Sequence, residues 1–213
     1  MACVVNGCLS YHRGDSRCDG TGILGATKGT GKLRIIAGEW RGRKLPVADL
    51  PGLRPSTDRS RETLFNWLAP HTAEARCLDL FAGTGALGLE ALSRGAAHCQ
   101  FVEQQSRAAK LLNESLALLG ANDRSDVWQG DARQFLQGSG TGKYDLVFLD
   151  PPFASDLLDI VLEELESSAL LAEAALVYVE CASDHSPSIP GPWEQHRSKK
   201  SGDVSYALYC VKK

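Results

Sequence analysis

Residues 78–92 read Leu-Asp-Leu-Phe-Ala-Gly-Thr-Gly-Ala-Leu-Gly-Leu-Glu-Ala-Leu, an apolar run that leads into a glycine turn and a helical pattern. Gly83 and Gly85 supply the backbone freedom that a tight strand-to-helix turn requires. From Ala86 onward, apolar side chains recur at helical spacing. In an open α/β sheet, such a turn places the N–H groups of a helix N-terminus at the carboxyl end of a parallel strand, where ligands bind. The pattern predicts an α/β fold with a ligand site here; a tight turn without a ligand is the alternative.

The glycine turn fits two cofactors. Gly83, Gly85 and Gly88 match G-x-G-x-x-G, and Glu103 ends the next apolar run, where an acid accepts hydrogen bonds from ribose hydroxyls. A nicotinamide dinucleotide and S-adenosylmethionine (SAM) both suit this arrangement. Asp79 favours SAM, because a pyrophosphate gains nothing from a carboxylate four residues before the first glycine. The Asp-x-x-x-Gly-x-Gly pattern resembles the first motif of SAM-dependent methyltransferases, in which this acid lies near the cationic methionine end of the cofactor.

A second motif follows the buried strand predicted at residues 144–149, where the chain continues as Asp150, Pro151, Pro152 and Phe153. Two consecutive prolines donate no backbone hydrogen bond and hold an extended shape. The Pro151 carbonyl therefore stays free beside the Asp150 carboxylate, and the two offer a pair of acceptors to one planar NH2 group. Phe153 offers a ring face for stacking. A mere strand-to-loop turn would not need an acid, two prolines and an aromatic together.

Charge is distributed unevenly along the chain. Residues 67–193 carry a formal charge of −11, whereas residues 32–66 carry +4 and residues 194–213 carry +3. Basic flanks around an acidic body suggest a polyanionic partner, with a solvated charged surface as the alternative.

The first basic flank predicts a hairpin at residues 33–45 and, after a proline-rich loop, a helix that ends near Leu68. Cations around an aromatic side chain suit phosphate contacts combined with stacking on a base or ribose. An ordinary basic edge strand is the alternative reading of the hairpin. The candidate nucleic-acid contacts are Arg34, Trp40, Arg41, Arg43, Lys44, Arg54, Arg59 and Arg61.

Strand and helix patterns alternate as far as residue 180, and two further strands at residues 193–200 and 204–211 flank a turn. This order predicts an α/β sandwich closed by an antiparallel pair. We expect residues 1–31 to be a disordered extension, residues 32–70 to form a basic arm, and residues 71–213 to form the methyltransferase domain.

From Leu33 to its end, the chain closely resembles the bacterial methyltransferases that make N2-methylguanosine in 16S ribosomal RNA. The resemblance lies in residues 33–36, 40–43, 54–59, 61–62, 79–88 and 150–153. It implies a class I, Rossmann-like fold with a mostly parallel seven-stranded sheet, a C-terminal antiparallel hairpin and an N-terminal hairpin and helix. It also implies SAM as the cofactor and 16S rRNA as the partner. We expect this rRNA to lie within a small-subunit assembly particle, with naked rRNA as the alternative. Residues 1–31 have no counterpart in this family pattern.

The resemblance also implies a mechanism. The target guanine leaves the RNA stack and enters the pocket. Asp150 and the Pro151 carbonyl accept the two hydrogens of its 2-amino group and aim the nitrogen lone pair at the methyl carbon, while Pro152 holds the loop extended and Phe153 stacks on the base. No metal takes part. The expected cofactor contacts are Asp79, Phe81, Gly83, Thr84, Gly85, Glu103, Asp131 and Ala132. A helix N-cap is the alternative role for Asp131.

Two related activities use the same acid–diproline–aromatic logic: methylation of adenine N6 in DNA and methylation of a glutamine amide in a protein. The chain leaves no room for a DNA target-recognition insertion, and its basic flanks argue against a protein substrate. No apolar run approaches the roughly 18 residues of a membrane span, and the N-terminus lacks the pattern of a signal peptide. The seven scattered cysteines suit free thiols. These features favour a cytoplasmic protein, and we expect it to be a monomer.

Overall fold

The computed structural model describes residues 31–47, 58–139, 142–152 and 157–212. Apart from Gly31, the extension predicted at residues 1–31 lies outside these ranges, and so do two predicted site residues, Arg54 and Phe153.

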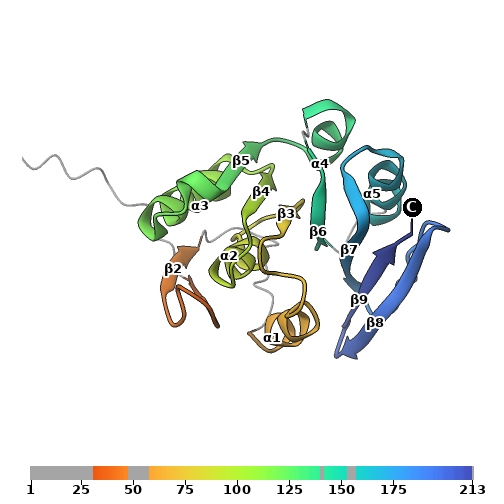
Figure 1. The fold of residues 1–213 in the computed structure, drawn as a ribbon, viewed down its shortest axis with the longest axis horizontal. Helices are drawn as coiled ribbons and strands as arrows, with labels where there is room; N and C mark the ends of the chain where they lie inside the picture. Colours follow the sequence, from red (N-terminus) through yellow and green to blue (C-terminus); the bar gives the residue numbers. More distant parts are fainter. Residues whose placement is uncertain (1–30, 48–57, 140–141, 153–156, 213) are drawn as a thin grey trace, which may run out of the picture.

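A seven-stranded sheet in the order β5-β4-β3-β6-β7-β9-β8 forms the centre of the molecule (Figure 1). The pairs β3–β4, β3–β6, β4–β5 and β6–β7 are parallel, and β9 pairs antiparallel with both β7 and β8. The predicted fold class is confirmed. The strand bounds are β3 Arg76–Asp79, β4 His98–Glu103, β5 Ser125–Gln129, β6 Tyr144–Leu149, β7 Leu171–Ala182, β8 Trp193–Ser201 and β9 Val204–Val211.

Helices cover both faces of this sheet. On one face, α1 (Asp58–Trp67), α2 (Ala86–Ser93) and α3 (Ser106–Leu119) pack on strand side chains such as Phe148 and Tyr178. On the other face, α4 (Ala132–Gln134), the π-helical turn η2 (Phe135–Ser139) and α5 (Leu157–Ser167) pack on the alternate strand residues. A 3₁₀ turn, η1 (Asn122–Arg124), precedes β5. Because side chains alternate across a strand, each buried strand supplies apolar groups to both layers.

The predicted N-terminal hairpin is present as a separate two-stranded antiparallel sheet. Its strands are β1 (Gly31–Arg34) and β2 (Lys44–Val47). The buried side chains of Leu33 and Leu45 join the same apolar cluster as α1, α2 and α3. The hairpin is therefore packed on the sandwich rather than projecting from it.

The strand β7 is longer than the predicted strand at residues 175–180. It starts at Leu171, which pairs with Tyr144, and the register then shifts before Leu146 pairs with Leu176. Ala174 lies in this irregular segment with a positive φ of 57°. A bulge of this kind breaks the alternation of polar and apolar side chains, so the pattern of the sequence hides the first part of the strand.

Close packing at Gly88 generates a prediction about stability. A Cβ at Gly88 in α2 would lie 2.2 Å from Cε1 of Phe101 and 2.6 Å from Sγ of Cys99. Gly88→Ala should therefore destabilise the protein by about 1–3 kcal/mol, although alanine favours a helix more than glycine does. Gly191→Ala is the matched control, because nothing lies within 4 Å of its Cβ position, and it should change stability by less than about 0.5 kcal/mol. Urea denaturation measures both, and equal stability of the two variants would contradict the packing argument.

Candidate functional site

Four acidic residues lie at the carboxyl ends of four adjacent parallel strands. Glu103 ends β4, Asp79 ends β3, Asp150 directly follows β6, and Glu180 lies near the end of β7. The first three are the acids that the sequence predicted, and the sheet order brings them together at one edge. Glu180 was missed, although it ends an apolar run in the same way as Glu103 does. This edge is the place where ligands bind in open α/β sheets.

The glycine turn joins β3 to α2 and has the backbone conformation that glycine favours. Gly83 has a φ of 53° and Gly85, the residue before α2, has a φ of 75°. A Cβ on Gly85 would also lie 2.5 Å from Cδ1 of Leu112. The turn therefore keeps a backbone surface without side chains at both glycines.

Glu103 is held by backbone N–H groups on two sides. Gly83 N donates to its Oε2 over 2.7 Å, and Gln105 N donates to its Oε1 over 2.7 Å. The side chain is buried, so these bonds fix its orientation beside the glycine turn. Each carboxylate oxygen has a second lone pair, and the group can therefore accept from a ligand hydroxyl while it keeps both bonds.

Asp79 is a buried carboxyl group whose Oδ2 accepts a hydrogen bond from Gly88 N over 3.0 Å. No lysine, arginine or histidine in the part of the chain that the structure describes forms an ion pair with it. Burial raises the pKa of Asp79 to about 7, the Gly88 N–H acts against this shift, and the charge of Glu103 adds to it. A buried acid without a cationic partner suits a ligand that carries positive charge.

The other predicted cofactor residues surround the same edge. Asp131 is the N-cap of α4, and its Oδ1 accepts from Arg133 N over 3.0 Å, so the N-cap role is confirmed. Gly130 N donates to the Glu103 carbonyl over 3.0 Å, which brings this loop beside Glu103. Ala132 is buried. Thr84, within the glycine turn, and Phe81, just before it, are half-buried.

At the end of β6, Asp150 is half-buried, Pro151 is buried and Pro152 is exposed. The hydrogen bond from Leu80 N to Phe148 O, at 3.2 Å, ties the ends of β3 and β6 together. The acid–diproline motif therefore lies next to the strand that carries the glycine turn.

On the neighbouring strand, Tyr178 Oη donates to Glu180 Oε2 over 2.6 Å. Glu180 is only 6% exposed, and burial raises its pKa, while the hydrogen bond from Tyr178 acts in the opposite direction. The rings of Tyr178 and Tyr206 are 6.1 Å apart and those of Trp67 and Tyr206 are 5.6 Å apart. Aromatic packing therefore fixes the tyrosine that holds Glu180.

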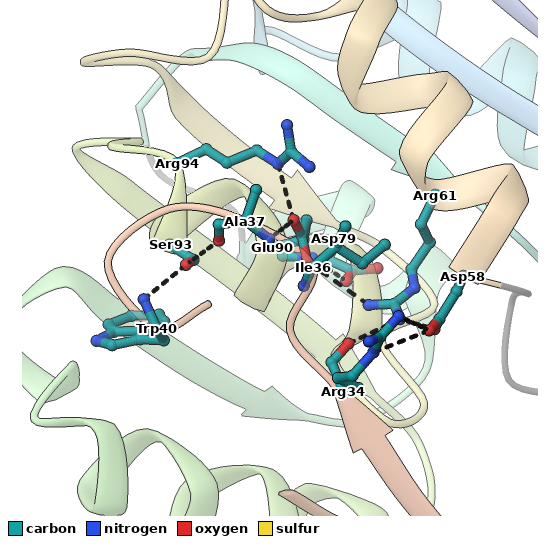
Figure 2. Close-up of polar contacts among 11 residues, drawn as sticks. Arg34, Ile36, Ala37, Trp40, Asp58, Arg61, Asp79, Glu90, Ser93 and Arg94 are labelled. Atoms are coloured by element: carbon teal, nitrogen blue, oxygen red, sulfur yellow. Dashed lines mark hydrogen bonds and ion pairs between the residues drawn. The ribbon is translucent and has the colours of Figure 1, made fainter. Parts of the chain in front are cut away.

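The N-terminal hairpin is fastened to α2 by polar contacts that Figure 2 shows. Glu90, fully buried in α2, accepts hydrogen bonds from Ile36 N over 2.8 Å and from Ala37 N over 3.0 Å. One turn later, Ser93 Oγ donates to Ala37 O over 2.6 Å and accepts from Trp40 N over 3.0 Å. We call these contacts of Glu90 and Ser93 the α2 clamp. The sequence analysis did not identify it.

Two predicted nucleic-acid contacts are interior residues, and the structure corrects them. Arg61 is 1% exposed; its Nη2 donates to Asp58 Oδ1 over 2.6 Å and to Arg34 O over 2.8 Å, and its Nη1 lies 3.7 Å from Glu90 Oε2 (Figure 2). It therefore neutralises buried acid instead of facing solvent. Trp40 is 4% exposed, and the Arg124 guanidinium lies 5.3 Å from its ring centroid. Neither side chain has a free face for RNA, because both are used in packing the hairpin.

The remaining described candidates lie on the surface. Arg34 is exposed and pairs with Asp58 over 2.9 Å. Arg43 is also exposed and donates to Leu118 O over 3.3 Å. The other exposed candidates are Arg41, Lys44 and Arg59.

Within the described ranges, no three histidine, cysteine, aspartate or glutamate residues are grouped so that they could hold a metal ion. None of the helices described there is long and apolar enough to cross a bilayer.

Comparison with known proteins places this chain in a family. The family model named Conserved hypothetical protein 95 matches residues 33–210. Ribosomal RNA small subunit methyltransferase D of Escherichia coli is 50% identical over 182 residues, which are 85% of this chain and 91% of that protein. The Haemophilus influenzae protein of the same name is 44% identical and covers 84% and 94%. A solved structure of the Escherichia coli protein yhhF has a TM-score of 0.80 at 47% identity, covering 85% of this chain and 99% of that one.

The raised pKa of Asp79 predicts a pH-dependent stability. Its folded pKa of about 7 lies above the unfolded value, so ionisation of Asp79 costs folding free energy. The stability that protonated Asp79 contributes is fully present below the unfolded pKa and is lost as the pH rises through the folded pKa. Asp79→Asn should therefore gain stability relative to wild type between about pH 4 and pH 7 and level off above. Urea denaturation of both proteins without SAM measures the difference.

Glu164→Gln is the matched control with the opposite sign. The hydrogen bonds from Arg133 lower the pKa of Glu164. The stability that ionised Glu164 contributes is therefore present above the unfolded pKa and is lost as the pH falls through the folded pKa. This variant should lose stability relative to wild type as the pH rises. A stability difference between Asp79→Asn and wild type that does not change with pH would contradict the account of Asp79.

Proposed function

Because this chain belongs to the family described by the Conserved hypothetical protein 95 model, we propose that it methylates the 2-amino group of a guanine in small-subunit ribosomal RNA. It is a SAM-dependent rRNA methyltransferase, as its 50% identical relative is by name an rRNA small subunit methyltransferase. The proposal adds the base, the atom and the residues. The observation that carries it is the pairing of β6 with β3, which brings Asp150 beside the glycine turn at one sheet edge.

The residues present fit SAM. The glycine turn offers a surface without side chains, Asp79 is a buried acid without a cationic partner in the described chain, and Glu103 is already oriented by two N–H groups. SAM supplies a methyl group on a cationic sulfur. We assign Asp79 to attract the cationic end and Glu103 to accept from the ribose hydroxyls. The assigned neighbours of the cofactor also include Phe81, Gly83, Thr84, Gly85, Asp131 and Ala132.

Asp150 and the Pro151 carbonyl hold the target amine in this proposal. An amine conjugated to a purine ring is a poor nucleophile, because its lone pair is shared with the ring. Two acceptors that fix its hydrogens turn the lone pair toward the methyl carbon, and positioning of this kind supplies much of the acceleration. Pro152 keeps the motif extended, and Phe153, outside the described residues, is assigned to stack on the base. The nitrogen would take the methyl group directly as the carbon–sulfur bond breaks, which leaves the sulfur as a neutral thioether, and the methylated amine would then lose one of its two protons. No covalent link to the protein is formed.

We assign the RNA contacts to the surface of the N-terminal arm, residues 32–70, and the chemistry to residues 71–213. The exposed cations Arg34, Arg41, Arg43 and Lys44 support this assignment, since phosphate contacts need accessible charge. The α2 clamp holds this surface against the helix that begins at the glycine turn. RNA bound there would therefore have a defined position relative to the cofactor site.

We propose the assembling small subunit as the substrate. We also propose the cytoplasm as the location, because the enzyme would meet ribosomal particles there. We propose that the protein acts as a monomer, since one chain supplies all four acids of the site and the basic arm.

Removal of the Asp150 carboxylate should abolish methyl transfer. Asp150→Ala is expected to lower the rate on small-subunit rRNA by about 100-fold or more, because the amine loses one of its two acceptors. SAM affinity, measured by calorimetry, should stay within about threefold. Asp203→Ala, in the β8–β9 turn, is the control and should methylate normally.

Labelled SAM and mass spectrometry of the digested RNA give both rate and product. Full activity of Asp150→Ala would remove Asp150 from the mechanism. A wild-type product other than N2-methylguanosine would refute the assignment of the base.

Charge removal on the arm should flatten the salt dependence of RNA binding. The variant Arg41→Ala/Arg43→Ala/Lys44→Ala should lower the slope of log affinity against log salt by about 2, because fewer counterions are released. Arg34 is left intact, since it pairs with Asp58 in the network of Arg61.

The comparison variant removes three exposed cations from β8, Arg197, Lys199 and Lys200, and should change the slope less. Filter binding or fluorescence anisotropy from low to physiological salt measures both variants. A slope that remains at the wild-type value in the arm variant would show that the arm is not the RNA-binding surface.

A further inference from the structure

We propose that Glu180 accepts the N1–H of the target guanine and thereby selects guanine over bases that lack this hydrogen. The inference rests on the proposed function above, because it extends the pocket that holds the 2-amino group. It makes Glu180 a specificity-determining residue of the same site.

The register of the sheet places Glu180 next to Asp150. Leu149 pairs with Val179 across the parallel strands β6 and β7, so the following residues, Asp150 and Glu180, are neighbours at about the 4.8 Å spacing of adjacent strands. Two residues earlier, Phe148 and Tyr178 pack in the cluster beneath α1 and α2. Alternation along each strand then puts both acids on this face of the sheet, which is also the face of Asp79 and its partner Gly88.

Glu180 is a buried carboxyl group of which one oxygen accepts no hydrogen bond from the described residues. Its Oε2 accepts from Tyr178 Oη, whereas its Oε1 accepts no hydrogen bond from any residue that the structure describes. The residue is only 6% exposed, yet Oε1 is not among the fully buried polar atoms that lack a partner in the described ranges, so this oxygen keeps contact with solvent. A ligand at this edge of the sheet can therefore reach Oε1 and supply the donor.

Guanine supplies the required donor at the required place. Its N1–H lies beside its 2-amino group on the same edge of the base, and both groups donate. With the amine held by Asp150 and the Pro151 carbonyl, N1–H is the next donor along this edge, and Glu180 is the next acid along the sheet. A base with a lone pair at N1 would face the carboxylate with two acceptors opposed. Sites built around a substrate N–H reject analogues that lack it far more strongly than apolar pockets reject a changed shape.

The test uses 2,6-diaminopurine, which keeps the 2-amino group but carries a lone pair at N1. The modified guanine is first mapped, and ligated small-subunit rRNA is then prepared with guanine or 2,6-diaminopurine at that position. Wild type should prefer guanine by about 100-fold in kcat/KM. Glu180→Gln should lower kcat/KM on guanine by about 10-fold or more and reduce the preference to about 10-fold or less, because its amide N–H can donate to N1. SAM affinity should not change.

Tyr178→Phe separates base recognition from a structural role. In Glu180→Gln, the amide oxygen can still accept from Tyr178 Oη, so the fold should survive. In Tyr178→Phe, that hydrogen bond is lost and the carboxylate of Glu180 remains. If Glu180 served only to satisfy Tyr178, the phenylalanine variant would reproduce the loss of base preference. We expect it to keep the guanine preference within about threefold of wild type.

Two results would overturn the proposal: an unchanged guanine preference in Glu180→Gln, or equal methylation of both RNAs by wild type. The second measurement needs no variant, so misfolding cannot obscure it. Failure of the proposed function is distinct, because wild type would then form no N2-methylguanosine on unmodified RNA.

Discussion

The arrangement of this protein depends on the hydrogen bonds and ion pairs that compensate the buried carboxylate of Glu90. An isolated charge in an apolar core is strongly destabilising unless hydrogen bonds and opposite charge compensate it. Glu90 receives two N–H groups from the N-terminal hairpin and the Nε of Arg94, and the Arg61 guanidinium lies within ion-pair distance. These partners come from the N-terminal hairpin, from α1 and from the residue that follows α2. The core can close around this acid only when hairpin, α1 and α2 are all in place.

This constraint extends to the cofactor site through α2. The helix begins at the glycine turn, donates Gly88 N to Asp79, and carries Glu90 and Ser93 on its second half. One short helix therefore contacts the strand end that carries a site acid and also holds the proposed RNA arm. Arg61 and Trp40, which the sequence suggested as RNA contacts, belong to this internal support, and the exposed cations of the hairpin are the ones that the proposed function assigns to phosphate.

The sheet order provides the second constraint. Strands β4, β3, β6 and β7 are parallel neighbours, so the acids at their carboxyl ends form a row on one face. Their environments differ. Glu103 is held by backbone N–H groups, Asp79 has one backbone donor and a raised pKa, and Glu180 is supported by Tyr178. Burial and hydrogen-bond partners distinguish these similar residues, and the roles proposed for them, toward a cation, hydroxyl groups and a base edge, follow these differences.

The sequence by itself determined the features that depend on near neighbours in the chain. The glycine turn, the acid–diproline motif and the alternating strands and helices are local patterns, since backbone conformation and side-chain periodicity extend over a few residues. Only the tertiary structure decided which polar residues are interior. Glu90 and its partner Ile36 are 54 residues apart, and Arg61 resembles any surface arginine until the core closes around it. The proximity of Glu180 to Asp150 likewise arises from strand pairing across a helix, and long-range register of this kind is set by packing of the whole sheet rather than by adjacent residues.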